Sequence, residues 1–219
     1  MRKIDKDAIA SKDFEKWHSS LKKDNHPKYN SSSNKYYFDI KMSLLYCQDG
    51  LCAYTEQRLC PKELLDESSW DSREYCRVLT KQERDSIQGD LEHFDESLKK
   101  SNGWLWDNLF VVSTHVNCRI KGRKAIEYIL KPDNPDYDPY KLLEYDDETS
   151  VFIANSKLSD DEKEKVSYMI ETLGINCIYN QRKRRLKEWQ DRLELGLSVE
   201  PDEYITAWEM FRILKGYNS

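Results

Sequence analysis

Hydrophobic residues recur at helical spacing through the last third of the chain. One expected helix begins at Ser159, whose capping box with Glu162 precedes apolar residues three and four positions apart, and it ends at Gly174. A second helix is expected from about 178 to 195, and a third after Pro201. The pattern predicts a helical C-terminal region.

The middle of the chain has a different pattern. Segments 91–94 and 108–113 are short and apolar, which fits two strands of a hairpin joined by a long loop. Helical spacing predicts a helix over 36–47 before them and another after Asn117, ending before Pro132. The predicted order is helix, strand, loop, strand, helix.

These elements predict an α+β chain in which a small core of two strands and a helix is embedded in a mostly helical protein with helical extensions at both ends. Residues 1–34 form a charged arm that ends in a linker signal, 35–130 form the core with an insertion near 56–89, and 131–219 form a helical extension. A chain of 219 residues suits one hydrophobic core, on which we expect the extension to pack.

Composition supports a folded chain that acts in the cytoplasm. The 14 Tyr, 6 Trp and 6 Phe supply core material, although 34% of the residues are charged. The N-terminus lacks the apolar run of a secretion signal, and nowhere do about 18 apolar residues follow one another. The six cysteines are expected to be buried thiols or metal ligands and not disulfides.

The formal net charge of −5 means that phosphate repels the chain at long range, so any contact with nucleic acid must be local. Two basic clusters are available, and both also fit ordinary solvated helix faces. The first consists of Arg119, Lys121, Arg123 and Lys124, and the second of 182–185 with Lys187. The first lies beside the candidate chemistry described next, which favours a phosphate-binding role for Arg119, Lys121 and Arg123.

Four residue types that can build a one-metal nuclease occur across the hairpin: Glu92, His93, Asn108 and Asn117. A carboxylate and an amide oxygen are hard ligands for Mg²⁺ or Mn²⁺, and a neighbouring imidazole can take a proton from water. The combination predicts hydrolysis of a phosphodiester. Each residue alone also fits a structural role, such as a surface charge, a core histidine, a turn former or a helix cap.

Two ambiguities remain within this set. Glu92 and His93 are adjacent, and successive side chains of a regular strand point to opposite faces, so we expect both at the exit of the strand. Asp90 is the alternative carboxylate, two residues earlier. His115 is an alternative to Asn117 as the distal metal ligand.

The chain resembles HNH endonucleases of the ββα-metal type, in particular the PtuB-like HNH subunits of retron and Septu anti-phage systems. The resemblance covers roughly 35–125. It rests on Leu-Cys-Ala-Tyr at 51–54, Glu-His-Phe at 92–94, Trp-Asp-Asn-Leu at 106–109, and Asn117 with Lys-Gly at 121–122.

The resemblance implies a role for each matching residue. His93 is similar to the family's general base, Glu92 and Asn117 to its two metal ligands, and Asn108 to the residue that holds the loop by hydrogen bonds. It further implies one Mg²⁺ or Mn²⁺, a nucleic-acid substrate, DNA in preference to RNA, and a PtuA-type ATPase partner in anti-phage defence.

The chain departs from the family at its zinc knuckles. Of the four cysteine positions only Cys52 remains, and the others hold Thr55, Ser113 and Val116. These side chains cannot complete a thiolate site, so no structural zinc is expected. The loss leaves two other functions open: an inactive, HNH-derived interaction subunit, or a nucleic-acid-binding protein.

Overall fold

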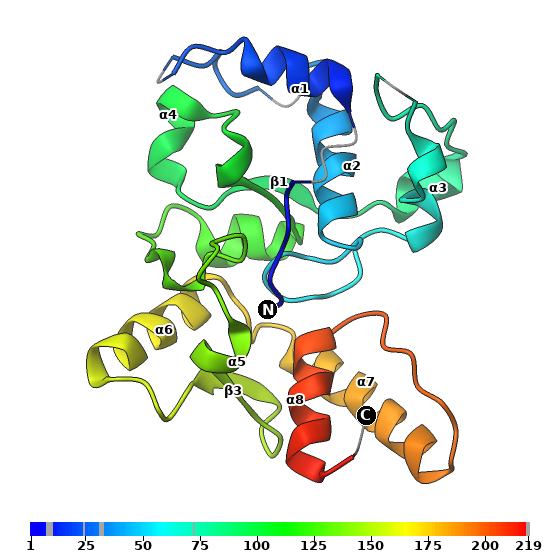
Figure 1. Ribbon diagram of the computed structural model, residues 1–219, viewed down its shortest axis with the longest axis vertical. Coiled ribbons are helices and arrows are strands. Elements are labelled where there is room, and N and C mark those ends of the chain that lie inside the picture. The colour runs from blue at the N-terminus through cyan, green and yellow to red at the C-terminus, as the bar shows by residue number, and fades with distance from the viewer. Residues whose placement is uncertain (8–10, 24, 31–32, 72, 218–219) are drawn as a thin grey trace. The chain divides into compact units, whose positions relative to one another are not determined.

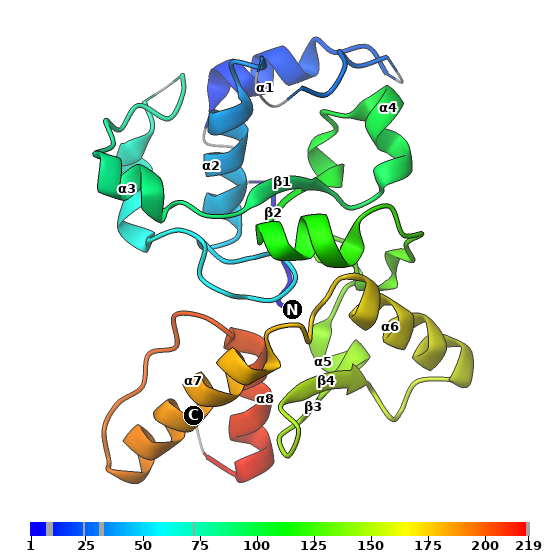
Figure 2. The ribbon, with the colours of Figure 1, turned by 180° about the vertical axis from the view of Figure 1, so that it is seen from behind.

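The computed structural model describes residues 1–7, 11–23, 25–30, 33–71 and 73–217 (Figures 1 and 2). Ser31 and Ser32, part of the expected linker, lie outside this set. The chain divides into two compact units. The N-terminal unit consists of Ile4–Ala53 and Arg58–Ile126, and the C-terminal unit consists of Met1–Lys3, Tyr54–Gln57 and Glu127–Ser219.

In its described residues, the N-terminal unit contains four α-helices: α1 (Lys12–Ser19), α2 (Tyr37–Cys47), α3 (Lys81–Ser86) and α4 (Lys99–Asn102). The predicted helix over 36–47 is confirmed by α2. The helix α1 lies inside the charged arm, and its Phe14 is fully buried. The arm therefore contributes to the core of this unit.

The predicted hairpin is confirmed. Strand β1 (Asp90–His93) pairs antiparallel with β2 (Leu109–Val112), so that Glu92 lies opposite Phe110 and His93 opposite Leu109. The buried Gln48, which follows α2, donates to the Val111 carbonyl (2.8 Å) and accepts from the Val111 N–H (2.9 Å). These hydrogen bonds hold α2 against the hairpin.

The helix after the hairpin is shorter than predicted. A π-helix, Val116–Lys121, ends at Gly122, whose φ of 52° lies in the left-handed region that glycine tolerates. The expectation of one helix reaching nearly to Pro132 was wrong, because only a separate 3₁₀ turn, Tyr128–Leu130, follows. Further 3₁₀ turns are Lys62–Leu64, Glu67–Ser69, Glu96–Leu98 and Trp106–Asn108.

The C-terminal unit contains the predicted helices α6 (Asp160–Thr172), α7 (Tyr179–Glu194) and α8 (Ile205–Lys215), which are confirmed. The capping box of Ser159 and Glu162 is formed at the start of α6. The chain is thus α+β, with mixed helices and strands in both units. No helix among the described residues is long and apolar enough to cross a membrane.

The C-terminal unit also holds a second hairpin that was not predicted. A short helix, α5 (Pro139–Leu142), leads into β3 (Leu143–Asp146), which pairs antiparallel with β4 (Val151–Ala154). Burial alternates along β3, with Leu143 and Tyr145 inward, so the strand signal exists but spans only four residues. The core of this unit includes the packed rings of Trp189, Trp208 and Phe211.

Candidate functional site

The end of β1 places two candidate residues beside each other in the sequence and on opposite faces of the hairpin. The register passes through Glu92 and His93 without an extra residue, so their side chains diverge as in a regular strand. Both side chains are buried, at 3% and 2% exposure. The strand ends at His93, as expected, but no bulge turns the two side chains to one face. The expectation that the strand exit brings both side chains to one site was therefore wrong, because the pairing stays regular through His93.

Lys121 ties the π-helix to this strand end. Its ammonium lies 2.5 Å from the Glu92 carboxylate and donates to the His93 carbonyl at 2.8 Å. The side chain is completely buried, so the ion pair has little solvent screening. Lys121 was expected to contact a phosphate. In the structure it instead forms a buried ion pair with Glu92, the candidate metal ligand.

His93 contacts a different set of groups. Its Nε2 lies 2.9 Å from the Gly103 carbonyl, its ring meets the Tyr29 ring edge-on at 4.6 Å, and its Nδ1 is 4.0 Å from the Glu96 carboxylate. Because a carbonyl only accepts, Nε2 carries the proton of the neutral ring and Nδ1 keeps its lone pair. Burial lowers the pKa of His93 to about 4, against smaller raising effects of the Gly103 carbonyl and Glu96.

The Asn108 side chain forms hydrogen bonds to the backbone of the loop that follows β1. Its side-chain oxygen accepts from the Asp95 N–H at 2.8 Å, and its amide donates to the Asp95 carbonyl at 2.9 Å. The backbone carbonyl of Asn108 accepts from the Phe94 N–H at 2.8 Å. These three bonds fix the chain just past His93.

The other candidates lie on or beside the π-helix, apart from Asp90. Asn117 is partly buried and sits four residues before Lys121, and residues four apart on a helix share one side, with Cβ atoms about 5–6 Å apart. His115, Arg119 and Arg123 are exposed. Asp90 is partly exposed, at the start of β1.

The donor types suit a hard cation, although no described group of three or more His, Cys, Asp or Glu could hold a metal ion. The candidate set is one carboxylate, Glu92, with the amide of Asn117, and substrate and water would have to supply the remaining ligands. Lys121 already neutralises Glu92. A divalent ion at this carboxylate would therefore share it with the ammonium or displace it.

Cys52, Ser113 and Val116, which occupy positions where the resemblance would place zinc-binding cysteines, are linked by hydrogen bonds. The Cys52 sulfur accepts from the Ser113 N–H at 3.4 Å, and the Ser113 hydroxyl accepts from the Val116 N–H at 3.3 Å. These hydrogen bonds connect the segment after α2 to the turn that enters the π-helix. All six cysteines are free thiols, but only Cys52 and Cys60 are buried, so the expectation of buried thiols was wrong for the exposed Cys76, Cys118 and Cys177.

A cavity of about 910 Å³ lies close to His93 and was not predicted from the sequence. Tyr29 and Glu96, which both contact the His93 ring, form part of its wall. Arg123 and Lys124 from the first basic cluster also line it. Only the tertiary fold brings the arm, the hairpin loop and this segment together.

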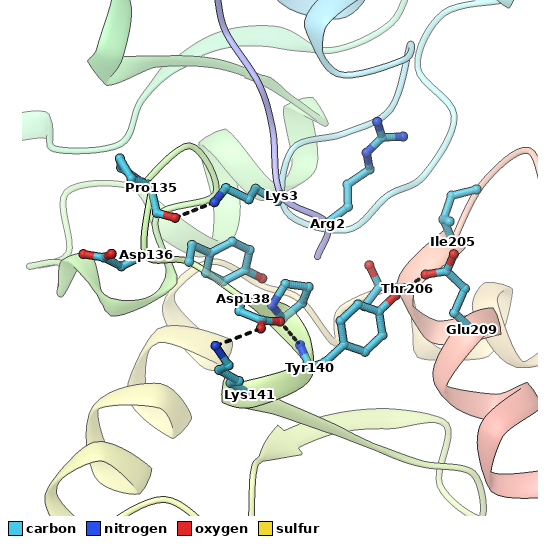
Figure 3. Close-up of a pocket in the computed structure, with 12 residues that line it drawn as sticks. Arg2, Lys3, Pro135, Asp136, Asp138, Tyr140, Lys141, Ile205, Thr206 and Glu209 are labelled. Carbon is cyan, nitrogen blue, oxygen red and sulfur yellow. Dashed lines mark hydrogen bonds and ion pairs between the residues drawn. The ribbon is translucent and has the colours of Figure 1, made fainter.

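The C-terminal unit has its own cavity, of about 660 Å³, shown in Figure 3. Its polar side chains are engaged with one another: Tyr140 donates to Glu209, Lys141 lies 3.5 Å from Asp138, and Lys3 donates to the Pro135 carbonyl. Such mutual engagement leaves few free groups for chemistry. The cavity beside His93 is the better candidate.

Comparison with known proteins adds no relationship. No protein-family model matches the chain, and no curated protein matches it.

Proposed function

We propose that the chain is a metal-dependent nuclease of the HNH type that hydrolyses phosphodiester bonds in nucleic acid. The observation that carries this proposal is the position of Lys121. By bonding the Glu92 carboxylate and the His93 carbonyl, it ties the helix that bears Asn117 to the end of the strand that bears the other two candidates.

Two further observations support the proposal. The order of β1, β2 and π-helix is the strand, strand and helix arrangement that the resemblance implies. The Cys52 to Ser113 hydrogen bond joins the two segments that would carry zinc knuckles in the family. These contacts are independent of the candidate catalytic residues, so they support the resemblance separately.

In the proposed reaction His93 takes a proton from the attacking water through Nδ1, the nitrogen that Gly103 leaves without a proton. Asn108 holds the loop after β1, and with it the position of the imidazole. Glu92 and Asn117 would hold the divalent ion, which would polarise a phosphoryl oxygen and stabilise the leaving oxygen. Because the Glu92 and His93 side chains point to opposite faces of the regular strand, the end of β1 would have to turn for both to act on one phosphate. Lys121 neutralises Glu92 when no ion is bound.

The test is a cleavage assay on plasmid, single-stranded DNA and RNA, with Mg²⁺, Mn²⁺ or EDTA. Wild-type chain should cleave only with a divalent ion, and His93→Ala should lower the rate by roughly 10²–10⁴-fold with unchanged folding. Asn117→Ala and His115→Ala, compared side by side, decide which is the distal ligand. Cleavage by His93→Ala at the wild-type rate would remove His93 from the mechanism.

An ATPase partner of the PtuA type and a role in anti-phage defence are parts of the proposal that rest on the resemblance alone. Because the net charge is negative, phosphate repels the chain by itself at long range, and a partner would bring the chain to its nucleic-acid substrate. The assay therefore includes the product of any neighbouring ATPase gene. Purification of the chain from its native cells without an ATPase would contradict this part.

A second function, an inactive subunit derived from such a nuclease, is favoured by one specific observation. Lys121 already occupies the Glu92 carboxylate at 2.5 Å, as a fixed ammonium would in a centre that no longer binds metal. Absence of cleavage on every substrate, with partner and both ions present, would support this function in place of the first.

A further inference from the structure

The cavity beside His93 has an unusual charge for this chain. Five basic side chains line it against two acidic ones, although the whole protein carries a net charge of −5. The basic residues come from three segments: Lys28 from the arm, Lys99 and Lys100 from α4, and Arg123 and Lys124 from the chain after the π-helix.

Most of these charges have no ion-pair partner among the residues that the structure describes. Lys28, Lys100, Arg123 and Lys124 are exposed, and none makes an ion pair with a carboxylate of the described residues. Lys99 is the exception, 3.1 Å from Glu96 and above the Tyr29 ring.

The two acidic residues are already engaged. Glu96 is paired with Lys99, and the Asp95 carboxylate accepts from the Ser97 N–H at 2.9 Å and its hydroxyl at 2.6 Å. An anion entering the cavity therefore meets four cations that form no ion pair among the described residues, while Glu96 is offset by Lys99 and the Asp95 carboxylate is hydrogen-bonded to Ser97. Charge complementarity points to a polyanion with several phosphates.

The basic residues of the second cluster differ from those around the cavity, because several of them form ion pairs. In α7, Arg185 pairs with Glu188 and Asp202, and Lys187 pairs with Asp191. Arg182 is buried. Most basic residues named in that cluster are therefore paired with carboxylates or buried, whereas four of the five around the cavity are exposed and form no ion pair among the described residues.

We infer that this cavity is the groove that binds the sugar–phosphate backbone of the nucleic-acid strand to be cut, and that the N-terminal arm supplies one wall of it. The inference rests on the proposed function for the identity of the strand. Tyr29 links the groove to the chemistry, because its ring forms the wall and lies 4.6 Å from the His93 ring. Phosphates held by Lys28, Lys100, Arg123 and Lys124 would lie in the cavity whose wall includes Tyr29 and Glu96, the two lining residues that contact the His93 ring.

The test is fluorescence anisotropy with a labelled single-stranded oligonucleotide of about 20 nucleotides, a length that spans typical binding sites. The full chain is used in EDTA at low salt, so that binding is measured without cleavage. Lys100→Glu/Lys124→Glu should bind at least about tenfold more weakly than wild type and lower the salt dependence by roughly 1.4 log units per log unit of salt.

The matched control is Lys81→Glu/Arg84→Glu, with the same charge change on exposed residues of the same unit. Its helix, α3, lies on the other side of α2 from α4 in both views (Figures 1 and 2). We expect the control to bind several-fold more tightly than the groove variant. A second groove variant, Lys28→Glu/Arg123→Glu, should repeat the loss if the first fails to fold.

Three results would overturn the inference: no binding by wild type at low salt, equal losses in groove and control variants, or equal competition by polyglutamate of matched charge. Its failure is distinguishable from failure of the nuclease proposal. Groove-dependent binding without cleavage under any condition would contradict the nuclease alone, whereas cleavage unaffected by the groove variants would contradict the groove alone.

Discussion

The two compact units share two structural features, an asparagine that binds a neighbouring backbone and a fully buried cation, but the surroundings of the cation differ. In each, an asparagine grips the backbone N–H and carbonyl of one residue: Asn108 grips Asp95, and Asn176 grips Phe152. Each unit also buries a cation completely, Lys121 in one and Arg182 in the other. The difference lies in what surrounds that cation.

Arg182 is satisfied by neutral groups. It donates to the Ser150 and Ile175 carbonyls and to the Asn176 side chain, and its guanidinium lies 4.8 Å above the Phe152 ring. Lys121 instead faces a carboxylate. Arg182 among carbonyls has no counter-charge to exchange and stabilises the fold. Under the proposed function, the Lys121 ammonium instead stands at the carboxylate where a divalent ion would bind.

The largest effect on stability is expected from Lys121→Met. It leaves the Glu92 carboxylate buried without its partner, which should cost about 3–5 kcal/mol. Urea unfolding measures the loss. The double variant Lys121→Met/Glu92→Gln should recover most of it, and an equal loss in single and double variants would show that the charge pair is not the cause.

Arg182→Leu should lower stability by about 2–4 kcal/mol, because the Ser150 and Ile175 carbonyls lose their buried donor. Divalent ions should not change this value, in contrast to variants of the Glu92 pair. Arg184→Leu, at an exposed position of the same helix, is the matched control and should stay within about 0.5 kcal/mol of wild type. Similar losses in both would contradict the structural role of Arg182.

Acid should destabilise the N-terminal unit through His93. The folded-state pKa of about 4 lies below the unfolded value near 6.5, so the unfolded chain binds more protons between these pH values. This contribution is fully present above pH ~6.5 and should be lost towards pH 4, by roughly 3 kcal/mol. His93→Gln should remove that part of the pH dependence, and an unchanged profile would contradict the burial of His93 as its cause.

The smallest effect should come from the asparagine clamps. Asn108→Ala and Asn176→Ala each remove two hydrogen bonds to one backbone, at roughly 1–3 kcal/mol each. Only Asn108→Ala should also reduce cleavage, since it holds the loop beside His93. Equal reductions of cleavage in the two variants at matched stability would show that the clamp has no special part in catalysis.

The elements that could be predicted from the sequence are those with a clear local pattern. The caps and the 3.6-residue periodicity predicted α6, α7 and α8, and the short apolar segments predicted the first hairpin. The second hairpin was missed although its strands are as long as those of the first. Its first strand directly follows α5, in a region whose Pro135 and Pro139 favoured a turn-rich connector. A π-helix has no comparable local signal, so the length of the helix after the first hairpin was also wrong.

The candidate site was predictable as a set of residue types and not as an arrangement. Charge and proximity suggested a phosphate contact for Lys121, but its burial against Glu92 depends on how the π-helix meets β1. The same holds for Tyr29, more than sixty positions before His93 in the sequence, yet against its ring in the fold. Such contacts belong to tertiary packing, which spacing along the chain does not reveal.

The most direct measurement is a titration of Mn²⁺ into wild-type chain and Glu92→Gln, followed by electron paramagnetic resonance of the free ion and by thermal unfolding. Arg182→Leu serves as a comparison with the other buried cation. Wild type and Arg182→Leu should each bind one ion and unfold at a higher temperature when it is bound. Glu92→Gln should not bind the ion, and its unfolding temperature should not change when the ion is added. Absence of binding by wild type, or equal binding by Glu92→Gln, would contradict an exchangeable cation site at the end of β1.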